Sequence, residues 1–306
     1  MKFSVITPCL NRAELIGPTI ESVIAQDYSD FEHWIIDGGS TDGTLDRLKR
    51  YRHLRLVSEA DRGVYDAMNK GIRLATGEVL ILLNSDDLLA RGAFSLVADI
   101  FRNAVGTMIV SAGCQIFQSR SDGVEIEMHR YDDPRRNALS LRNVTIGTPN
   151  INARFFRRKV FEQIGEFDLA YPIAADRDFL IRAALRQLPD APIAKVLYRY
   201  RWHAGSLTMN AGSDSLLSGM EDSRRIIARS IQKSSVNREQ LACFNQWGRE
   251  CQATEVMIYV VQGRFREALS TWLRALGQDP RFFVTAIRMG LLAVGRRLRT
   301  WWRLRK

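Results

Sequence analysis

The first 118 residues alternate short apolar runs with amphipathic segments. Four short runs predict β-strands, at residues 3–7, 34–36, 54–57 and 79–83; the first is predicted to be buried, and the fully apolar fourth to be central in the sheet. Helices are predicted between the strands: apolar residues recur at helical spacing from Ile16 to Ile24, a second helix covers 44–51, and a third passes through Val64 and Met68 to a C-cap at Gly77. This order predicts an α/β fold in which helices cover both faces of a mostly parallel, mixed sheet.

The hydrophobic periodicity weakens after residue 118. Shorter strands are expected from 119 to 205, together with helices near 158–164 and 176–187. A segment of this kind usually covers the binding edge of the sheet. From Ala211 onward the pattern is helical throughout, and we place the boundary near residues 210–213, whose composition suits a linker.

Composition and charge narrow the function classes. The chain has 306 residues, 46% hydrophobic and 25% charged, which is ordinary globular usage and excludes a disordered or fibrous protein. The net charge is +10, but residues 281–306 contain eight basic residues and no acid, so that 36 basic residues face 34 acidic ones in the rest. The basicity therefore belongs to the tail, and a partner that only the tail touches is favoured over nucleic acid.

Neither the cysteines nor the apolar runs indicate an extracellular or membrane-spanning protein. Cys9, Cys114, Cys243 and Cys251 are widely spaced and form no metal-ligand pattern with the four histidines, so we expect reduced thiols in a cytoplasmic protein. The N-terminal apolar run is too short for a signal sequence. The longest apolar stretch, 282–294, is interrupted by an arginine and falls short of the roughly 20 residues that span a bilayer.

Acidic residues follow the predicted strands, where an open parallel sheet binds its ligands. Asp37, Asp61 and the pair Asp86 and Asp87 occupy these positions. No glycine-rich phosphate loop follows the first strand, which excludes dehydrogenase and P-loop functions. Adjacent carboxylates at a strand end suit Mg²⁺ or Mn²⁺, and the alternative is that they cap the helix expected near Ala93.

Four segments carry a resemblance to a known family, and their order and spacing match it as well. The segments Ser4–Pro8, Ile36–Thr44, Asp61–Gly71 and Leu83–Asp87 resemble family-2 glycosyltransferases of the GT-A fold. The resemblance covers roughly residues 1–205. Within the family, the sequence is most similar to bacterial enzymes that build exopolysaccharide, lipopolysaccharide or glycolipid sugars. It implies a nucleotide-sugar-binding half at 1–118, an acceptor-binding half at 119–210, and a helical extension at 211–306.

The resemblance also implies a donor site for a nucleoside-diphosphate sugar. Thr7 and Asp37 would line the pocket for the base and ribose. Asn84, Ser85 and Asp86 would occupy the D-x-D motif, in which Asp86 binds the Mg²⁺ or Mn²⁺ that bridges the two phosphates. Asn84 offers only a neutral oxygen, which makes Asp87 a second metal candidate. The other donor-binding positions implied are Pro8, Asn11, Asp61, Arg62, Asn69, Ser85, Arg201 and His203.

A catalytic base is implied in the segment 172–182. Asp176 aligns with the family's base, which would take the proton of the acceptor hydroxyl, while Ala175 replaces the first acid of the usual doublet. Asp178 is a less favoured substitute. The alternative for Asp176 is a helix N-cap, and both roles could coexist. Ile151-Asn152-Ala153 departs from the His-Gln-Ala of many relatives.

The C-terminal part contains two further signals. Residues 263–280 resemble the second half of one tetratricopeptide repeat, and a single copy predicts a local helical hairpin. Beyond it, an apolar run and an end that mixes arginines with Trp301 and Trp302 are typical of a helix at an anionic membrane surface. The alternative is a terminal helix with a solvated basic face.

The sequence therefore predicts a metal-dependent, inverting glycosyltransferase in cell-surface polysaccharide or glycolipid synthesis. It would act on a glycan or lipid-linked acceptor, in the cytoplasm and peripherally at the inner face of the cell membrane. Sugar-phosphate nucleotidylyltransferases share a similar sheet, but their glycine-rich N-terminal loop is absent. A non-catalytic membrane adaptor with a degenerate nucleotide site stays open as the alternative.

Overall fold

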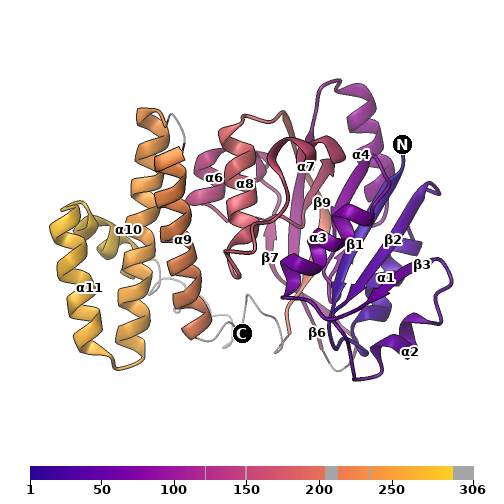
Figure 1. Cartoon of the computed structure of the whole chain (residues 1–306), viewed down its shortest axis with the longest axis horizontal. Coiled ribbons are helices and arrows are strands. Elements are labelled where there is room, and N and C mark those ends of the chain that lie inside the picture. Colours follow the sequence, from indigo (N-terminus) through magenta and orange to yellow (C-terminus); the bar gives the residue numbers. More distant parts are fainter. Residues whose placement is uncertain (121, 149, 204–212, 234–235, 292–306) are drawn as a thin grey trace. The chain divides into compact units, whose positions relative to one another are not determined.

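The structure is a computed structural model that describes residues 1–120, 122–148, 150–203, 213–233 and 236–291 (Figure 1). The chain divides into two compact units, Met1–Asn210 and Ala211–Lys306. The predicted linker positions 210–212 and the tail 292–306 lie outside the described residues.

A nine-stranded sheet forms the centre of the first unit. Its strand order is β3-β2-β1-β4-β8-β6-β9-β5, and β7 pairs with β6. The first four strands all pair in parallel and are β1 (Phe3–Cys9), β2 (Phe31–Asp37), β3 (Leu54–Ser58) and β4 (Val79–Leu82). Each contains most of a predicted run. β1 and β4 are buried along their whole length, as a strand covered on both faces requires, whereas β3 is half-buried to exposed.

The second half of the sheet is mostly antiparallel. It contains β5 (Leu88–Leu89), β6 (Ile109–Ser119), β7 (Glu125–Tyr131), β8 (Arg154–Arg157) and β9 (Asp190–Arg201). β8 runs antiparallel to both β4 and β6, and β9 runs parallel to β6 but antiparallel to β5. The predicted mixed sheet is confirmed, and its parallel part coincides with the region of clearest periodicity.

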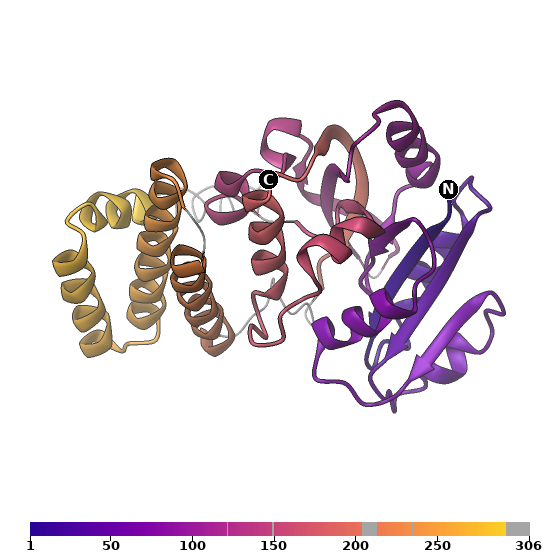
Figure 2. The ribbon, with the colours of Figure 1, turned by 45° about the horizontal axis from the view of Figure 1, so that its top comes forward.

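Helices cover both faces of this sheet (Figure 2). On one face lie α1 (Ile16–Ile24), α2 (Thr44–Leu48) and α4 (Ala93–Asn103), which pack against alternate residues of β1 and β2. On the other lie α3 (Val64–Leu74), α7 (Arg158–Ile164) and α8 (Ala175–Leu185). Two short helices, α5 (Pro134–Asn137) and α6 (Leu141–Thr145), connect β7 to β8.

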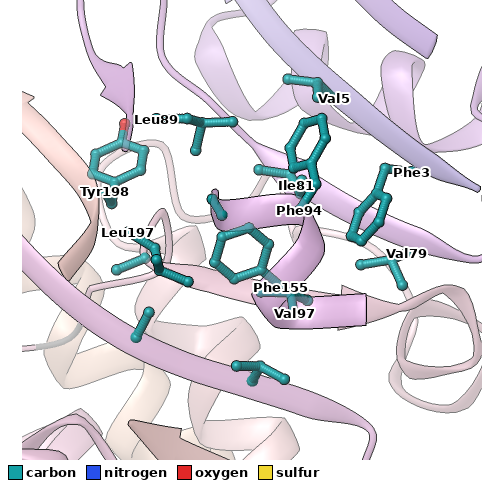
Figure 3. Close-up of a cluster of buried hydrophobic side chains, with 14 of the residues drawn as sticks. Phe3, Val5, Val79, Ile81, Leu89, Phe94, Val97, Phe155, Leu197 and Tyr198 are labelled. Atoms are coloured by element: carbon teal, nitrogen blue, oxygen red, sulfur yellow. The ribbon is translucent and has the colours of Figure 1, made fainter. Parts of the chain in front are cut away.

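The largest described core cluster lies between β1, β4, β8 and α4. The Phe3 and Phe94 rings stack with centroids 4.8 Å apart, and Val79, Ile81 and Phe155 surround them (Figure 3). All five side chains are fully buried. Burying a large apolar side chain contributes about 1.5–3 kcal/mol, so this cluster anchors β1 and β4, whose carboxyl ends carry the site described below.

Two helix boundaries differ from the prediction, since α2 ends at Leu48 and not at residue 51, and α3 ends earlier as well. Helix α3 ends at Leu74, and Ala75 rather than Gly77 is its C-cap. A Cβ at Gly77 would lie 2.7 Å from the Lys2 carbonyl oxygen and 2.8 Å from the Phe3 carbonyl carbon. Glycine is therefore required there by the close approach of the backbone that enters β4 to β1, and not by a helix end.

The second unit is helical, as the sequence predicts. Its helices are α9 (Ser213–Lys233), α10 (Arg238–Val261) and α11 (Phe265–Gln278), and a further helical segment covers 282–291. Asn237 and Gln240 form a capping box at the start of α10, which satisfies two otherwise unpaired amides. Helices α10 and α11 form the predicted hairpin. Within the described residues, no helix has the length and hydropathy needed to cross a bilayer.

Candidate active site

A cavity of about 530 Å³ opens in the first unit at the carboxyl ends of β1 and β4. Its walls come from the loop after β1, the start of α3, the loop after β4, the segment before β8, the start of α8 and the end of β9. The lining residues are Pro8, Cys9, Leu10, Asn11, Arg12, Asp61, Gly63, Val64, Tyr65, Ala67, Met68, Asn84, Ser85, Asp86, Ile151, Asn152, Asp176 and Tyr200.

The loop after β1 is held by the loop after β2. Asn11 has a φ of 52°, and its side-chain oxygen accepts a hydrogen bond from the Thr41 amide at 2.9 Å. The amides of Asn11 and Arg12 donate to the hydroxyls of Ser40 and Thr44, each at 2.8 Å. Asparagine tolerates positive φ better than most residues. These bonds hold Asn11 and Arg12 at the cavity wall.

Asp37 organises the loop after β2. Its carboxylate is fully buried and accepts hydrogen bonds from the Gly39 and Ser40 amides at 3.1 and 3.0 Å and from the Ser58 hydroxyl at 2.7 Å. The Ser40 hydroxyl also donates to it. Asp37 does not line the cavity, so its described contacts support the loop that in turn holds Asn11.

Asp86 lines the cavity beside basic groups. Its Oδ2 atom lies 3.0 Å from His203 Nε2 and 3.8 Å from Arg12 Nε. The Arg201 guanidinium donates to the Asp86 carbonyl oxygen at 3.0 Å, and burial lowers the pKa of Arg201. Three basic side chains thus surround the loop that contains Asp86, one from near the start of the first unit's sequence and two from near its end. This arrangement suits anionic ligands.

The neighbouring Asp87 is turned into the protein. Its carboxylate is fully buried and accepts hydrogen bonds from the Tyr198 hydroxyl at 2.5 Å, the Arg201 amide at 2.7 Å and the Asn84 amide group at 3.1 Å. Burial and the charge of Asp86 raise its pKa, and these hydrogen bonds oppose that rise. Asp87 ties the loop after β4 to β9 and does not line the cavity.

Asp176 lies in the first turn of α8 and faces the cavity. Ala174 is the N-cap and Asp176 is the second helical residue, so the N-cap alternative is wrong. The Asp176 carboxylate accepts a hydrogen bond from the Arg177 amide at 2.7 Å. Burial raises the pKa of Asp176, and the Arg177 charge and hydrogen bonds from Arg177 and Tyr65 lower it. A carboxylate with a raised pKa at a cavity wall is suited to proton transfer.

Asp178 has different surroundings. It is buried, and its carboxylate accepts a hydrogen bond from Arg182 Nε at 2.7 Å. The same guanidinium donates to the carbonyl oxygens of Ile164 and Glu166. Asp178 therefore joins α8 to the end of α7 and is absent from the cavity wall.

The cavity gathers six of the predicted site residues: Pro8, Asn11, Asp61, Ser85, Asp86 and Asp176. Seven others do not line it: Thr7, Asp37, Arg62, Asn69, Asp87, Arg201 and His203. Arg201 and His203 contact Asp86 without lining the cavity themselves. Asp61 reaches the wall because Gly38 leaves room for it, since a Cβ at Gly38 would lie 2.5 Å from its carboxylate.

Three of the residues outside the wall make contacts within the protein. Thr7 is buried, with its hydroxyl 2.9 Å from His33 Nε2. Asn69 exchanges two hydrogen bonds with the Phe167 backbone, at 2.9 and 3.0 Å. Arg62 is exposed and pairs with Asp66 at 3.3 Å. These contacts hold β1 and α3 in place.

The sequence prediction gave no role to several lining residues, chiefly Arg12, Tyr65, Met68 and Tyr200. Two of them had a signal. Arg12 lies in the loop after the first strand, and Tyr65 lies in the same segment as Asp61, four residues further along the chain. Tyr200 could not have been placed from the sequence, because β9 reaches the cavity through long-range pairing with β5 and β6.

The residues at the Asp86 end can supply only part of the coordination shell of a divalent cation, and a bound ligand would have to supply further oxygens. Among the described residues, no group of three or more His, Cys, Asp or Glu side chains is placed to hold a metal ion. Mg²⁺ characteristically binds one or two carboxylates and completes its shell with water and substrate phosphates. Asp86 with the side-chain oxygen of Asn84 matches that partial protein shell.

Comparison with known proteins decides the family. Residues 4–165, more than half of the chain, match the model of glycosyl transferase family 2. The chain belongs to glycosyl transferase family 2. This family-2 chain is 35% identical over 189 residues to the PGL/p-HBAD biosynthesis glycosyltransferase of Mycobacterium tuberculosis strain H37Ra, a match that covers 59% of the chain and 68% of the relative.

Solved structures share the fold of this family-2 glycosyltransferase. Residues 1–349 of S. aureus TarS in complex with UDP-GlcNAc match with a TM-score of 0.62 and 21% identity, over 92% of the chain and 81% of that structure. The mannosyltransferase PcManGT from Pyrobaculum calidifontis, in complex with GDP-Man and Mn²⁺, matches with a TM-score of 0.59 and 20% identity, over 96% and 86%. The longer TarS structure is matched over about half of its length, 49%. The predicted family and GT-A-like fold are confirmed.

Proposed function

We propose that this family-2 glycosyltransferase moves a sugar from a nucleoside-diphosphate sugar to an acceptor hydroxyl with inversion at the anomeric carbon. The observation that carries the proposal is that one cavity holds both Asp86, beside Arg12 and His203, and Asp176, whose burial raises its pKa. The basic side chains around Asp86 can bind an anionic leaving group, and Asp176 can act as a general base. The UDP-GlcNAc and GDP-Man bound by the structural neighbours support the donor class.

At the Asp86 end, the chain would bind the diphosphate of the donor. Arg12 and His203 lie within 4 Å of the Asp86 carboxylate and can turn toward phosphate oxygens while they stay near it. Asp86 and Asn84 would hold Mg²⁺ or Mn²⁺, which supplies positive charge against the leaving diphosphate. Asp87 is a weaker ligand candidate, because its oxygens already accept three hydrogen bonds inside the protein.

At the other end, Asp176 would accept the proton of the acceptor hydroxyl as the oxygen attacks the anomeric carbon. A direct attack that displaces the diphosphate from the far side inverts this centre. A positioned general base contributes about 10²- to 10⁴-fold to the rate. Because only the ionised carboxylate can accept the proton, transfer should rise with pH through the raised pKa of Asp176.

Donor binding is the first test. UDP-, GDP-, dTDP- and CDP-sugars are added with and without Mn²⁺ to the wild type and to Asp86→Ala, and the melting temperature is recorded. A ligand at 100 times its Kd adds about 2.7 kcal/mol to the native state. We expect one nucleotide class to raise the melting temperature in a Mn²⁺-dependent way in the wild type only.

The matched control is Asp46→Ala, which removes an exposed acid of α2 that pairs only with Lys49 among its described ion pairs. It should retain the full shift. No shift with any donor, or an equal shift in Asp86→Ala, would contradict the donor site. Donor binding without any hydrolysis or transfer, with every acceptor class tried, would favour the non-catalytic adaptor.

We further propose that the C-terminal region contacts an anionic membrane surface from the cytoplasmic side and that the acceptor is lipid-linked. In the helical segment 282–291, Phe282 is buried against Trp272, with ring centroids 5.1 Å apart. Phe283, Val284, Ile287 and Leu291 are exposed. This apolar strip leads into the basic residues of 292–306, a combination that favours interfacial lipid.

Vesicle binding tests the membrane proposal. A truncation of residues 292–306 keeps Phe282 in its packed position, whereas removal of 281–306 would also damage the helical unit. The truncated protein should lose sedimentation with phosphatidylglycerol vesicles, and neither protein should bind phosphatidylcholine vesicles. High salt should weaken binding of the full chain, because exposed charges are screened. Unchanged binding after truncation would refute the proposal.

A further inference from the structure

Tyr65 connects the start of α3 to the start of α8 across the cavity wall. Its ring packs on Phe167, with centroids 5.3 Å apart and planes tilted by 39°. Its hydroxyl donates a hydrogen bond to the carbonyl oxygen of Ile173 at 3.2 Å, in the loop that leads into α8. The side chain is therefore held at both ends, by ring packing and by a hydrogen bond.

The Asp176 carboxyl group lines the same cavity wall as Tyr65, three residues beyond Ile173. Burial raises the pKa of Asp176, and the Arg177 charge, the Arg177 amide and a hydrogen bond from Tyr65 lower it. A tyrosine hydroxyl has one proton to donate and can also accept. Tyr65 therefore has two acceptors within reach, the carboxylate and the Ile173 carbonyl oxygen, and it can donate to only one of them at a time. This sharing is significant because one of the two acceptors changes its protonation state during the proposed reaction.

We propose that Tyr65 is a positioning residue that holds the Asp176 carboxylate toward the acceptor and serves both of its protonation states. The proposal rests on the role of Asp176 as the base. While Asp176 is ionised, the Tyr65 proton points to the carboxylate. After Asp176 takes the acceptor's proton, the Tyr65 proton turns to the Ile173 carbonyl oxygen, and the new carboxylic acid can donate to the Tyr65 oxygen.

No covalent bond to Tyr65 forms or breaks in this scheme. The acceptor oxygen loses one proton, Asp176 gains it, and the hydroxyl of Tyr65 only rotates. The Arg177 amide, which donates to Asp176 at 2.7 Å, has a fixed direction and cannot adapt in this way. Tyr65 is thus the partner whose hydrogen bonding can follow the proton.

The direct test needs neither donor nor acceptor. The carboxyl carbons of aspartate are labelled with ¹³C and titrated by NMR in wild type and Tyr65→Phe, and the Asp176 signal is assigned by its loss in Asp176→Asn. Phenylalanine keeps the ring on Phe167 and removes only the hydroxyl. Because a hydrogen bond to the ionised form stabilises that form, the pKa of Asp176 should rise in Tyr65→Phe.

The matched control is Tyr28→Phe, which removes a hydroxyl that donates to the Met1 carbonyl oxygen at 2.8 Å. It should leave the Asp176 titration unchanged. An unchanged Asp176 titration in Tyr65→Phe, with the melting temperature preserved, would overturn the role of Tyr65 whatever Asp176 does in catalysis.

The kinetic test separates this proposal from the proposed function. With a donor identified, Tyr65→Phe should lower kcat about tenfold at the acid end of the pH profile, with the deficit shrinking as pH rises and the donor KM unchanged. If Tyr65→Phe moves the Asp176 titration but Asp176→Asn still transfers sugar, the base assignment fails and the Tyr65 contact stands as structural. A pH-independent loss in Tyr65→Phe would contradict the positioning role.

Discussion

The two ends of the cavity place the same type of side chain in opposite surroundings. Asp86 has Arg12 and His203 within 4 Å of its carboxylate, and both are basic. Asp176 accepts a hydrogen bond from the Arg177 amide, and burial raises its pKa even though the Arg177 charge and the Tyr65 hydroxyl lower it. Asp86 is thus placed to hold positively charged groups near the donor site, and Asp176 is placed to gain and lose a proton.

The difference shows how one sheet edge can supply two kinds of chemistry. Enzymes commonly separate acid and base roles by giving similar carboxylates different solvation and different neighbours. Here the two carboxylates come from different parts of the fold. The parallel half delivers Asp86 after β4, and the helix α8, which packs on the opposite face from α1, delivers Asp176. Substitution of Asp86, Asp176 or the buried acids beside them, Asp87 and Asp178, should therefore have different effects.

Asp176→Asn should have the largest effect. We expect sugar transfer to fall by about 10²- to 10⁴-fold, because the amide cannot accept a proton, while the donor-induced shift in melting temperature is retained. The variant should also melt higher at neutral pH. A buried acid with a raised pKa loses native stability as pH rises above its unfolded pKa, and asparagine does not titrate.

Two measurements check this prediction. Transfer is followed by release of the nucleoside diphosphate, and unfolding by differential scanning calorimetry at pH 5 and pH 7. The stability gain should be larger at pH 7 than at pH 5. Wild-type turnover in Asp176→Asn would remove the contrast between the two ends of the cavity.

The periodicity of the sequence predicted the parallel half of the fold well. Short apolar runs identified β1 to β4, and the continuous run of β4 reflects its burial on both faces, whereas Arg55 interrupts the run of the exposed β3. The position after β4 identified Asp86, because the carboxyl ends of parallel strands meet at one edge. Asp176 came from the family resemblance alone, and its place in the first turn of α8 needed the structure.

Side-chain direction could not be predicted from the same patterns. Asp86 and Asp87 are adjacent in the sequence, yet only the first faces the cavity. Their separation depends on Tyr198, which lies 111 positions from Asp87 and reaches it through the β5–β9 pairing. Thr7 and Asn69 likewise belong to matched segments but point to partners inside the protein. Long-range packing decides such directions.

Asp87→Asn should affect stability more than donor binding. Three donors face the Asp87 carboxyl group, and asparagine replaces one of its two oxygens with an amide nitrogen that cannot accept a hydrogen bond, which costs about 1–3 kcal/mol. Burial raises the pKa of Asp87 to about 8, so between the usual aspartate range and that value the native state holds a proton that the unfolded state releases. Wild-type stability should therefore fall as pH rises through this window.

Asparagine cannot titrate at this position. The free energy of unfolding of the variant should therefore fall furthest below that of the wild type near pH 5, and by less near pH 8. Urea unfolding at pH 5, 6.5 and 8, followed by tryptophan fluorescence, measures the difference. Donor binding, measured below the melting transition, should change by less than it does in Asp86→Ala. An equal loss of Mn²⁺-dependent binding in both variants would make Asp87 a metal ligand after all.

Asp178→Asn should have the smallest effect. It tests whether the base must be the acid that faces the cavity or whether another acid of α8 can serve. Asparagine can still accept from Arg182, which also donates to the carbonyl oxygens of Ile164 and Glu166, so we expect a loss of only about 1 kcal/mol. Transfer per folded molecule should stay within about twofold of wild type, since asparagine leaves Asp176 and the cavity intact. Side-by-side turnover of Asp176→Asn and Asp178→Asn, at matched folded concentration, decides the point. A larger loss of transfer in Asp178→Asn than in Asp176→Asn would move the base two residues along the helix and away from the cavity, against the geometry of α8.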